Sequence, residues 1–154
     1  MWEAVVAAER QVTRCRADFY QAAESRAETL RAALTGSNWE RRAAFAFLQS
    51  LPDDVPILLD QLVELALSHR WAPFARRVIS GARRDAVLPA LGVMVTARLV
   101  VADPDEYRRL AELTAAVDGW ETLREIVRAA LQNDDPDVRE VGVDFTEKYG
   151  GMLI

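Results

Sequence analysis

The sequence predicts an all-α protein, a right-handed α-α superhelix of stacked antiparallel helix pairs. Apolar residues recur three and four positions apart in most segments, and helix-start residues precede those segments. Similar corner residues also return with a period of about 32. These corner residues are Trp39, Trp71, Pro104 and Pro136, separated by 32, 33 and 32 positions. A fixed period of this size is typical of a solenoid, in which each repeat packs on the next.

The chain has the size and composition of one domain. Its 154 residues are 51% apolar and 28% charged, which suits a folded core. We expect an N-terminal helical segment at 1–36, helix-pair repeats at 37–69, 70–102 and 103–133, and a terminal half-repeat at 134–154.

The N-terminal segment has two possible forms. Residues 2–34 contain no Pro or Gly, and they form either one helix of about 50 Å or two helices that break near residues 17–20. Gly36 then ends the helix, and Ser37 or Asn38 caps the next one.

The predicted helices follow in antiparallel pairs. They are 39–50 with 55–68, 72–81 with 86–102, and 104–117 with 120–132, followed by an unpaired helix at 136–148. Segment 86–102 is apolar almost all round, so we expect it in the middle of the stack and among the most buried helices. A buried strand is the alternative there, but no neighbouring strand is available to pair with it.

The last corner is the most informative. Asp135 can cap a helix, Pro136 suits its first position, and Val138, Val141 and Phe145 share one stripe. Residues 135–141, Asp-Pro-Asp-Val-Arg-Glu-Val, resemble the start of a HEAT repeat, an armadillo-like helical unit. Pro104 with Arg108 is a looser copy, and the resemblance covers about residues 37–149. It implies a curved stack in which Arg139 pairs with an acid of the preceding corner, Asp103 or Asp105.

Composition and charge limit the partners and the cellular location that we expect for this protein. The net charge of −5 disfavours nucleic acid as a partner, although residues 102–154 carry most of the imbalance, with thirteen acids against six bases. The single Cys15 excludes an internal disulfide. Met1 leads into a charged amphipathic run, and the longest nearly uncharged run, 86–97, is too short for a membrane span. We therefore expect a cytoplasmic protein without a membrane helix.

The residues that usually carry catalysis are sparse. His69 is the only histidine, and neither a nucleophile elbow nor a phosphate-binding glycine loop occurs. The pairs Asp53-Asp54 and Asp134-Asp135 stand at predicted helix starts, where carboxylates act as caps. We predict no catalytic residue, no metal and no cofactor.

Two features are candidates for binding a partner. Trp39 and Trp71 stand at equivalent repeat positions and are expected on the same side of the stack, where they either fill the corner or form a docking surface. Around Trp71 and Phe74, five arginines fall within fifteen residues: Arg70, Arg76, Arg77, Arg83 and Arg84. We expect stacking to gather them into one patch that meets an acidic protein surface.

The leading functional hypothesis is a non-enzymatic protein–protein interaction module, a small scaffold or regulatory protein. HEAT-like stacks also occur in DNA alkylation-repair glycosylases, so the first alternative is a protein that binds nucleic acid or is related to that class. The second alternative is an immunity-type inhibitor that covers a toxin.

Overall fold

The computed structural model describes residues 1–154 and confirms the all-α prediction, because it contains nine α-helices, three short 3₁₀ turns and no strand. The α-helices are α1 (Trp2–Gln21), α2 (Ala23–Leu34), α3 (Asn38–Ser50), α4 (Leu59–Leu67), α5 (Ala72–Ser80), α6 (Arg84–Leu99), α7 (Pro104–Ala116), α8 (Trp120–Leu131) and α9 (Pro136–Tyr149). The 3₁₀ turns are η1 (Pro52–Asp54), η2 (Pro56–Leu58) and η3 (Gly150–Met152). None of the helices is both long enough and apolar enough to cross a membrane.

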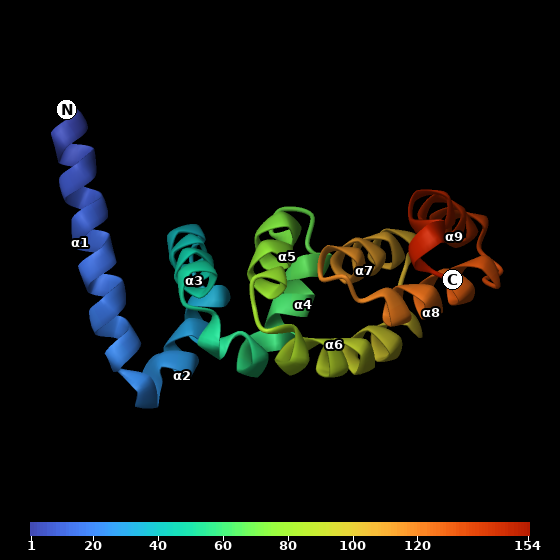
Figure 1. Cartoon of the computed structure of the whole chain (residues 1–154), viewed down its shortest axis with the longest axis horizontal. Coiled ribbons are helices and arrows are strands. Elements are labelled where there is room, and N and C mark those ends of the chain that lie inside the picture. The colour runs from blue at the N-terminus through green and yellow to red at the C-terminus, as the bar shows by residue number, and fades with distance from the viewer.

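The helices from α2 onward alternate between two rows (Figure 1). One row holds α3, α5, α7 and α9, and the other holds α2, α4, α6 and α8. Each helix of the first row packs on the next, while α4 with α5 and α7 with α8 join the two rows. The molecule is therefore an elongated two-layer stack.

Local signals place the helix starts as expected. The Ser37 hydroxyl accepts a hydrogen bond from the Glu40 backbone N–H, and the Glu40 carboxylate accepts one from the Ser37 N–H. Asp103 and Glu106 form the same reciprocal cap on α7. Asp135 caps α9, and Pro104 and Pro136 occupy the first positions of their helices. These start signals are confirmed, but the expected caps Asp53 and Asp54 are not. Asp53 accepts a hydrogen bond from Tyr20, and Asp54 pairs with Arg26.

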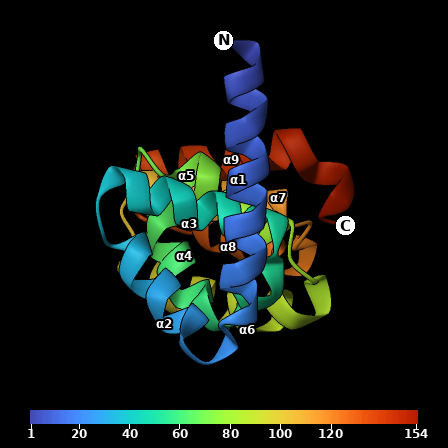
Figure 2. The ribbon, with the colours of Figure 1, turned by 90° about the vertical axis from the view of Figure 1, so that its left-hand side faces the viewer.

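The N-terminal segment forms two helices that meet at Ala22. No residue of α1 is buried, and its N-terminal half projects beyond the rest of the molecule (Figures 1 and 2). Only its end is anchored, where Phe19 packs edge-on against Phe47 of α3 with ring centroids 5.0 Å apart. In the same region, Tyr20 donates a hydrogen bond to Asp53.

The predicted helix at 55–68 is wrong at its start. The chain makes the turns η1 and η2 before α4 begins at Leu59. Pro52 and Pro56 explain this difference, because each lacks a backbone N–H and its ring opposes a continuous helix through the preceding turn.

The turn between α7 and α8 ends α7 with a Schellman arrangement. The N–H groups of Asp118 and Gly119 donate back to the carbonyls of Ala115 and Thr114. Asp118 takes the left-handed position with φ of 54°, which Asp tolerates better than most residues. This turn separates the two helices predicted at 104–117 and 120–132.

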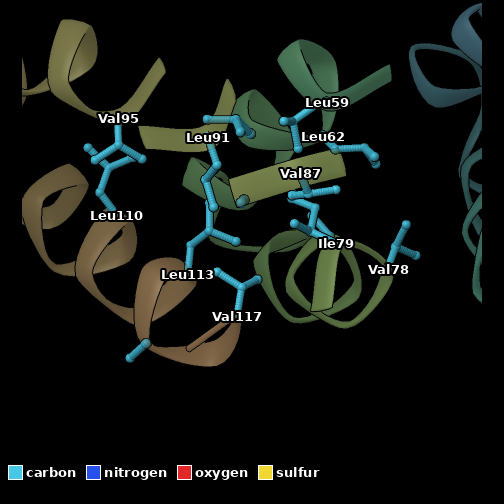
Figure 3. Close-up of a cluster of buried hydrophobic side chains, with 14 of the residues drawn as sticks. Leu59, Leu62, Val78, Ile79, Val87, Leu91, Val95, Leu110, Leu113 and Val117 are labelled. Atoms are coloured by element: carbon cyan, nitrogen blue, oxygen red, sulfur yellow. The ribbon is translucent and has the colours of Figure 1, made fainter. Parts of the chain in front are cut away.

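One core of 33 buried apolar residues runs through the stack. Figure 3 shows its centre, where the buried Val87, Leu91 and Val95 line one side of α6. Leu91 and Val95 lie toward Leu113 and Leu110 of α7, and Val87 lies beside Ile79 of α5. Val87, Leu91 and Val95 are the only buried residues of α6. The prediction that this helix is among the most buried is therefore wrong, because α6 packs between α4 and α8 in its row and no element covers its other side.

Candidate protein-binding surface

The five arginines near α5 do not form one free patch. Arg70 precedes the helix, whereas Arg83 and Arg84 follow its end, so they lie at opposite ends of α5. Arg76 pairs with Glu112 of α7 at 2.5 Å, while Arg77 is exposed.

The two arginines beyond α5 also contact acids of the chain. Arg83 pairs with Asp85 at 2.7 Å and lowers the pKa of that carboxyl, first by hydrogen bonding. Arg84 reaches the carboxylate of Asp118 at 3.4 Å and donates to the carbonyls of Val117 and Asp118. The expectation of a single arginine patch is corrected, because three of the five arginines are paired within the chain.

The two tryptophans occupy different environments. Trp71 is only 4% exposed and stacks on Phe45, with Phe74 beside both rings. The guanidinium of Arg70 covers the Trp71 ring at 5.2 Å. Trp71 therefore fills a corner and is not free to anchor a partner.

Trp39 is 80% exposed, which corrects the expectation that it is equivalent to Trp71. It is the second residue of α3, whereas Trp71 is the residue before α5. A shift of two positions turns a helical side chain by about 200°. The residues that do correspond, immediately before each helix, are Ser37, Trp71, Asp103 and Asp135.

Arg139 does not make the expected ion pair with Asp103 or Asp105. It donates to the backbone carbonyls of Asn133 and Asp134 at 2.7 and 2.8 Å. Those carbonyls lie in the corner that precedes α9, and Arg139, one turn into that helix, reaches back to them. Arg139 therefore stabilises its own corner, where the end of α8 is electrically negative.

A different set of ion pairs joins the repeats. Arg76 of α5 pairs with Glu112 of α7, and Arg108 of α7 pairs with Asp144 of α9 at 2.7 Å. Both arginines stand five residues after the cap, and both acids stand nine residues after it. The recurrence of Arg at 76 and 108, and of an acid at 112 and 144, is a sequence signal that could have predicted this ladder.

The surface that sequence reasoning missed is the outer side of α6. From Ala86 to Val101, the exposed residues are Ala86, Pro89, Ala90, Val93, Thr96, Ala97, Val100 and Val101. We call these eight residues the apolar face of α6. Only Thr96 among them is polar, and Val93, Val100 and Val101 are 72, 85 and 73% exposed. Single exposed apolar residues are ordinary on a protein surface, whereas a continuous uncharged face makes this side of α6 a candidate interaction site.

Beside this face lies a groove of about 980 Å³ between α6 and the start of α8. We call it the α6–α8 groove. Its α6 wall is formed by five residues of the apolar face, together with Leu88 and Gly92. The five are Pro89, Val93, Thr96, Ala97 and Val100. The opposite wall carries Trp120, Thr122 and three acids, Asp118, Glu121 and Glu125. No basic residue lines the groove, so one wall is apolar and the other is acidic.

Two contacts hold the walls in place. At Gly92 the helices approach so closely that an added Cβ would lie 3.1 Å from the Thr122 hydroxyl. At the far end of α6, Arg98 pairs with Glu106 at 2.6 Å and with Glu64 at 3.2 Å. The apolar face is therefore presented by a helix fixed at both its middle and its end.

The remaining polar candidates lie apart from this groove. Arg109 donates to Nδ1 of the exposed His69 at 3.2 Å, so His69 serves as an acceptor there and not as a cap of helix carbonyls. Cys15 is exposed on α1. No group of three or more His, Cys, Asp and Glu residues is arranged to hold a metal ion.

No family model matches the chain, and the searches of curated proteins and of solved structures also find no match.

Proposed function

We propose that the chain is a short HEAT-like stack that serves as a non-enzymatic protein-binding module, with the apolar face of α6 as its docking surface. The observation that carries this proposal is the uncharged, solvent-facing side of a helix that is otherwise fixed in the stack. A fold of paired helices supplies extended faces of this kind without catalytic groups.

The HEAT-like assignment is supported by geometry that repeats along the chain. The caps Trp71, Asp103 and Asp135 are spaced by 32 residues, and Asp-Pro opens both α7 and α9. The ion pairs of Arg76 and Arg108 recur with the same spacing.

The other functional hypotheses have less support. A nucleic-acid binder needs free basic groups, whereas Arg76, Arg83 and Arg84 are paired with acids. An acidic partner at these arginines loses support for the same reason. An immunity-type role is a special case of protein binding, and identification of the partner would establish it.

The test is affinity capture from the native cell extract, followed by identification of the bound proteins. The variant Val93→Ser/Val100→Ser changes two exposed valines seven residues apart on α6. The matched control Val5→Ser/Val12→Ser changes two exposed valines with the same spacing on α1. We expect the α6 variant to lose at least one partner that the wild type and the control both retain. If the α6 variant keeps every wild-type partner while remaining folded, the proposed docking surface is wrong.

A further inference from the structure

The shape of the α6–α8 groove limits what can fill it. Its apolar wall extends from Leu88 to Val100, a span of about 18 Å at the helical rise of 1.5 Å per residue. An elongated apolar strip of this length accepts the apolar stripe of a helix of three to four turns, whose backbone polar groups are already satisfied internally. The occupant is therefore one amphipathic helix.

The charges of the groove determine which charge the polar edge of the bound helix must carry. Glu121 and Glu125 stand one turn apart on α8, both exposed, and neither belongs to an ion pair within the chain. Asp118 differs, because Arg84 already contacts it. Like charges four residues apart on a helix repel each other, so a cation seated between the two glutamates relieves an unfavourable contact.

Glu121 and Glu125 differ in position from the other acids of residues 102–154. Glu121 and Glu125 border an apolar strip, so an incoming helix that covers the strip must bring its edge beside them. If the edge of the incoming helix were acidic, it would place like charges beside the two glutamates. This repulsion strongly disfavours a partner helix with an acidic edge.

The chain's own free helix is a poor match. On α1, Glu9 lies between the exposed valines Val5 and Val12 and next to Arg10. Arg10 and Arg14 stand one turn apart, but with Glu9 beside them the polar edge of α1 carries both signs of charge. An occupant with a uniformly basic edge must come from another protein.

We propose that the α6–α8 groove binds a cationic amphipathic helix of a partner protein, with Lys or Arg of that helix placed against Glu121 and Glu125. This inference rests on the proposed function and adds the chemistry of the partner. In this proposal, the charges of the groove select the partner, and the apolar wall supplies most of the binding affinity.

The experiment uses the full chain and three synthetic helical peptides of about 14 residues. All three carry the same leucine stripe, and the edge beside the stripe carries lysine, glutamine or glutamate. Binding is measured by fluorescence anisotropy at about 50 mM and about 500 mM NaCl. We expect the lysine peptide to bind at least about tenfold more tightly than the glutamine peptide at low salt, and the glutamate peptide to bind most weakly. The difference should shrink at high salt.

Two variants test whether Glu121 and Glu125 cause the preference for the lysine peptide. Glu121→Arg/Glu125→Arg should abolish or reverse the order of the three peptides. The matched control Glu24→Arg/Glu28→Arg alters two exposed acids with the same spacing on α2, and it should leave the order unchanged. Circular dichroism of both variants checks that they are folded.

The outcomes separate this inference from the proposed function. Equal binding of the three peptides, an order that the α8 variant does not change, or no binding of any peptide overturns the cationic-helix inference. If binding lacks a charge order but Val93→Ser/Val100→Ser removes it, the docking surface stands and only the partner chemistry is wrong. If Val93→Ser/Val100→Ser binds the peptides as the wild type does, the docking surface itself is refuted.

Discussion

At the scale of single residues, Gly142 shows how closely two helices of the stack approach. It lies buried in α9, and a Cβ built there would meet the side chain of Leu131 at 2.9 Å and its backbone nitrogen at 3.1 Å. The backbone of Gly142 is not left-handed. The glycine is therefore needed for space and not for conformation.

We expect Gly142→Ala to destabilise the protein by up to about 2 kcal/mol, because an overpacking cost of about 1–3 kcal/mol outweighs the gain of about 1 kcal/mol in helix propensity. Chemical denaturation measures this change. Gly150→Ala is the control, since no atom lies within 4 Å of a Cβ at that position. A Gly142→Ala protein more stable than the wild type would contradict this account of the α8–α9 contact.

Glu40 offers a second prediction at this scale. Hydrogen bonds from the Ser37 backbone N–H and then from its side chain lower the pKa of Glu40. A carboxyl whose pKa is lower in the folded state stabilises the protein above its unfolded pKa, and that contribution is lost as the pH falls through the folded pKa. The Tm of Glu40→Gln should therefore lie below that of the wild type at pH 7 and converge with it in acid. A constant Tm difference down to pH 2 would argue against the cap.

At the scale of the element, α6 has two sides with opposite roles. Val87, Leu91 and Val95 face the core, whereas Val93 and Val100 face solvent. Hydrophobicity all round a helix predicts burial on all sides, but the stack covers α6 on only one side. The second apolar side therefore stays exposed to solvent in the isolated chain.

We expect Leu91→Asp to unfold the protein or to cost several kcal/mol, because it buries an unpaired charge in a molecule with a total stability of about 5–15 kcal/mol. Val93→Asp, two residues further along the same helix, should change the free energy of unfolding by no more than about 0.5 kcal/mol. Urea denaturation of the two variants compares the sides directly. Equal effects of the two substitutions would mean that α6 has no free side.

At the scale of the whole molecule, stability is distributed unevenly along the stack. The buried core begins at Leu30 and continues to Phe145, while α1 contributes no buried residue. Helix α1 is joined to the rest by its last turn, where Phe19 and Tyr20 make their contacts. Segments with so few buried contacts open locally without unfolding the remainder.

Deletion of residues 1–14 should therefore change the free energy of unfolding by less than about 0.5 kcal/mol. Hydrogen exchange should show the amides of residues 2–14 exchanging much faster than those of α4, α7 and α8. Thermal denaturation of the truncated chain and of the full chain provides the comparison. A large loss of Tm on truncation would show that α1 is held by contacts that the fold does not explain.

The sequence by itself determined the features that depend on neighbours along the chain. Ser37, Asp103 and Asp135 cap the helices that follow them, and Pro104 and Pro136 open theirs. The all-α class and most helix ranges follow from the same local rules, since capping and helical periodicity act within a few residues. Two prolines in one corner delayed α4, an effect that was also visible in the sequence.

Only the tertiary structure decided which side of each helix is covered and which charges meet. An apolar stripe requires a partner surface, but its pattern is the same whether that surface belongs to this chain or to another protein. For this reason, the exposed side of α6 was mistaken for core, and the buried Trp71 was grouped with the exposed Trp39. The pairing of Arg76 with Glu112 and the position of Arg139 likewise depend on how one repeat is placed on the next, because an ion pair forms only where packing brings the groups within about 4 Å.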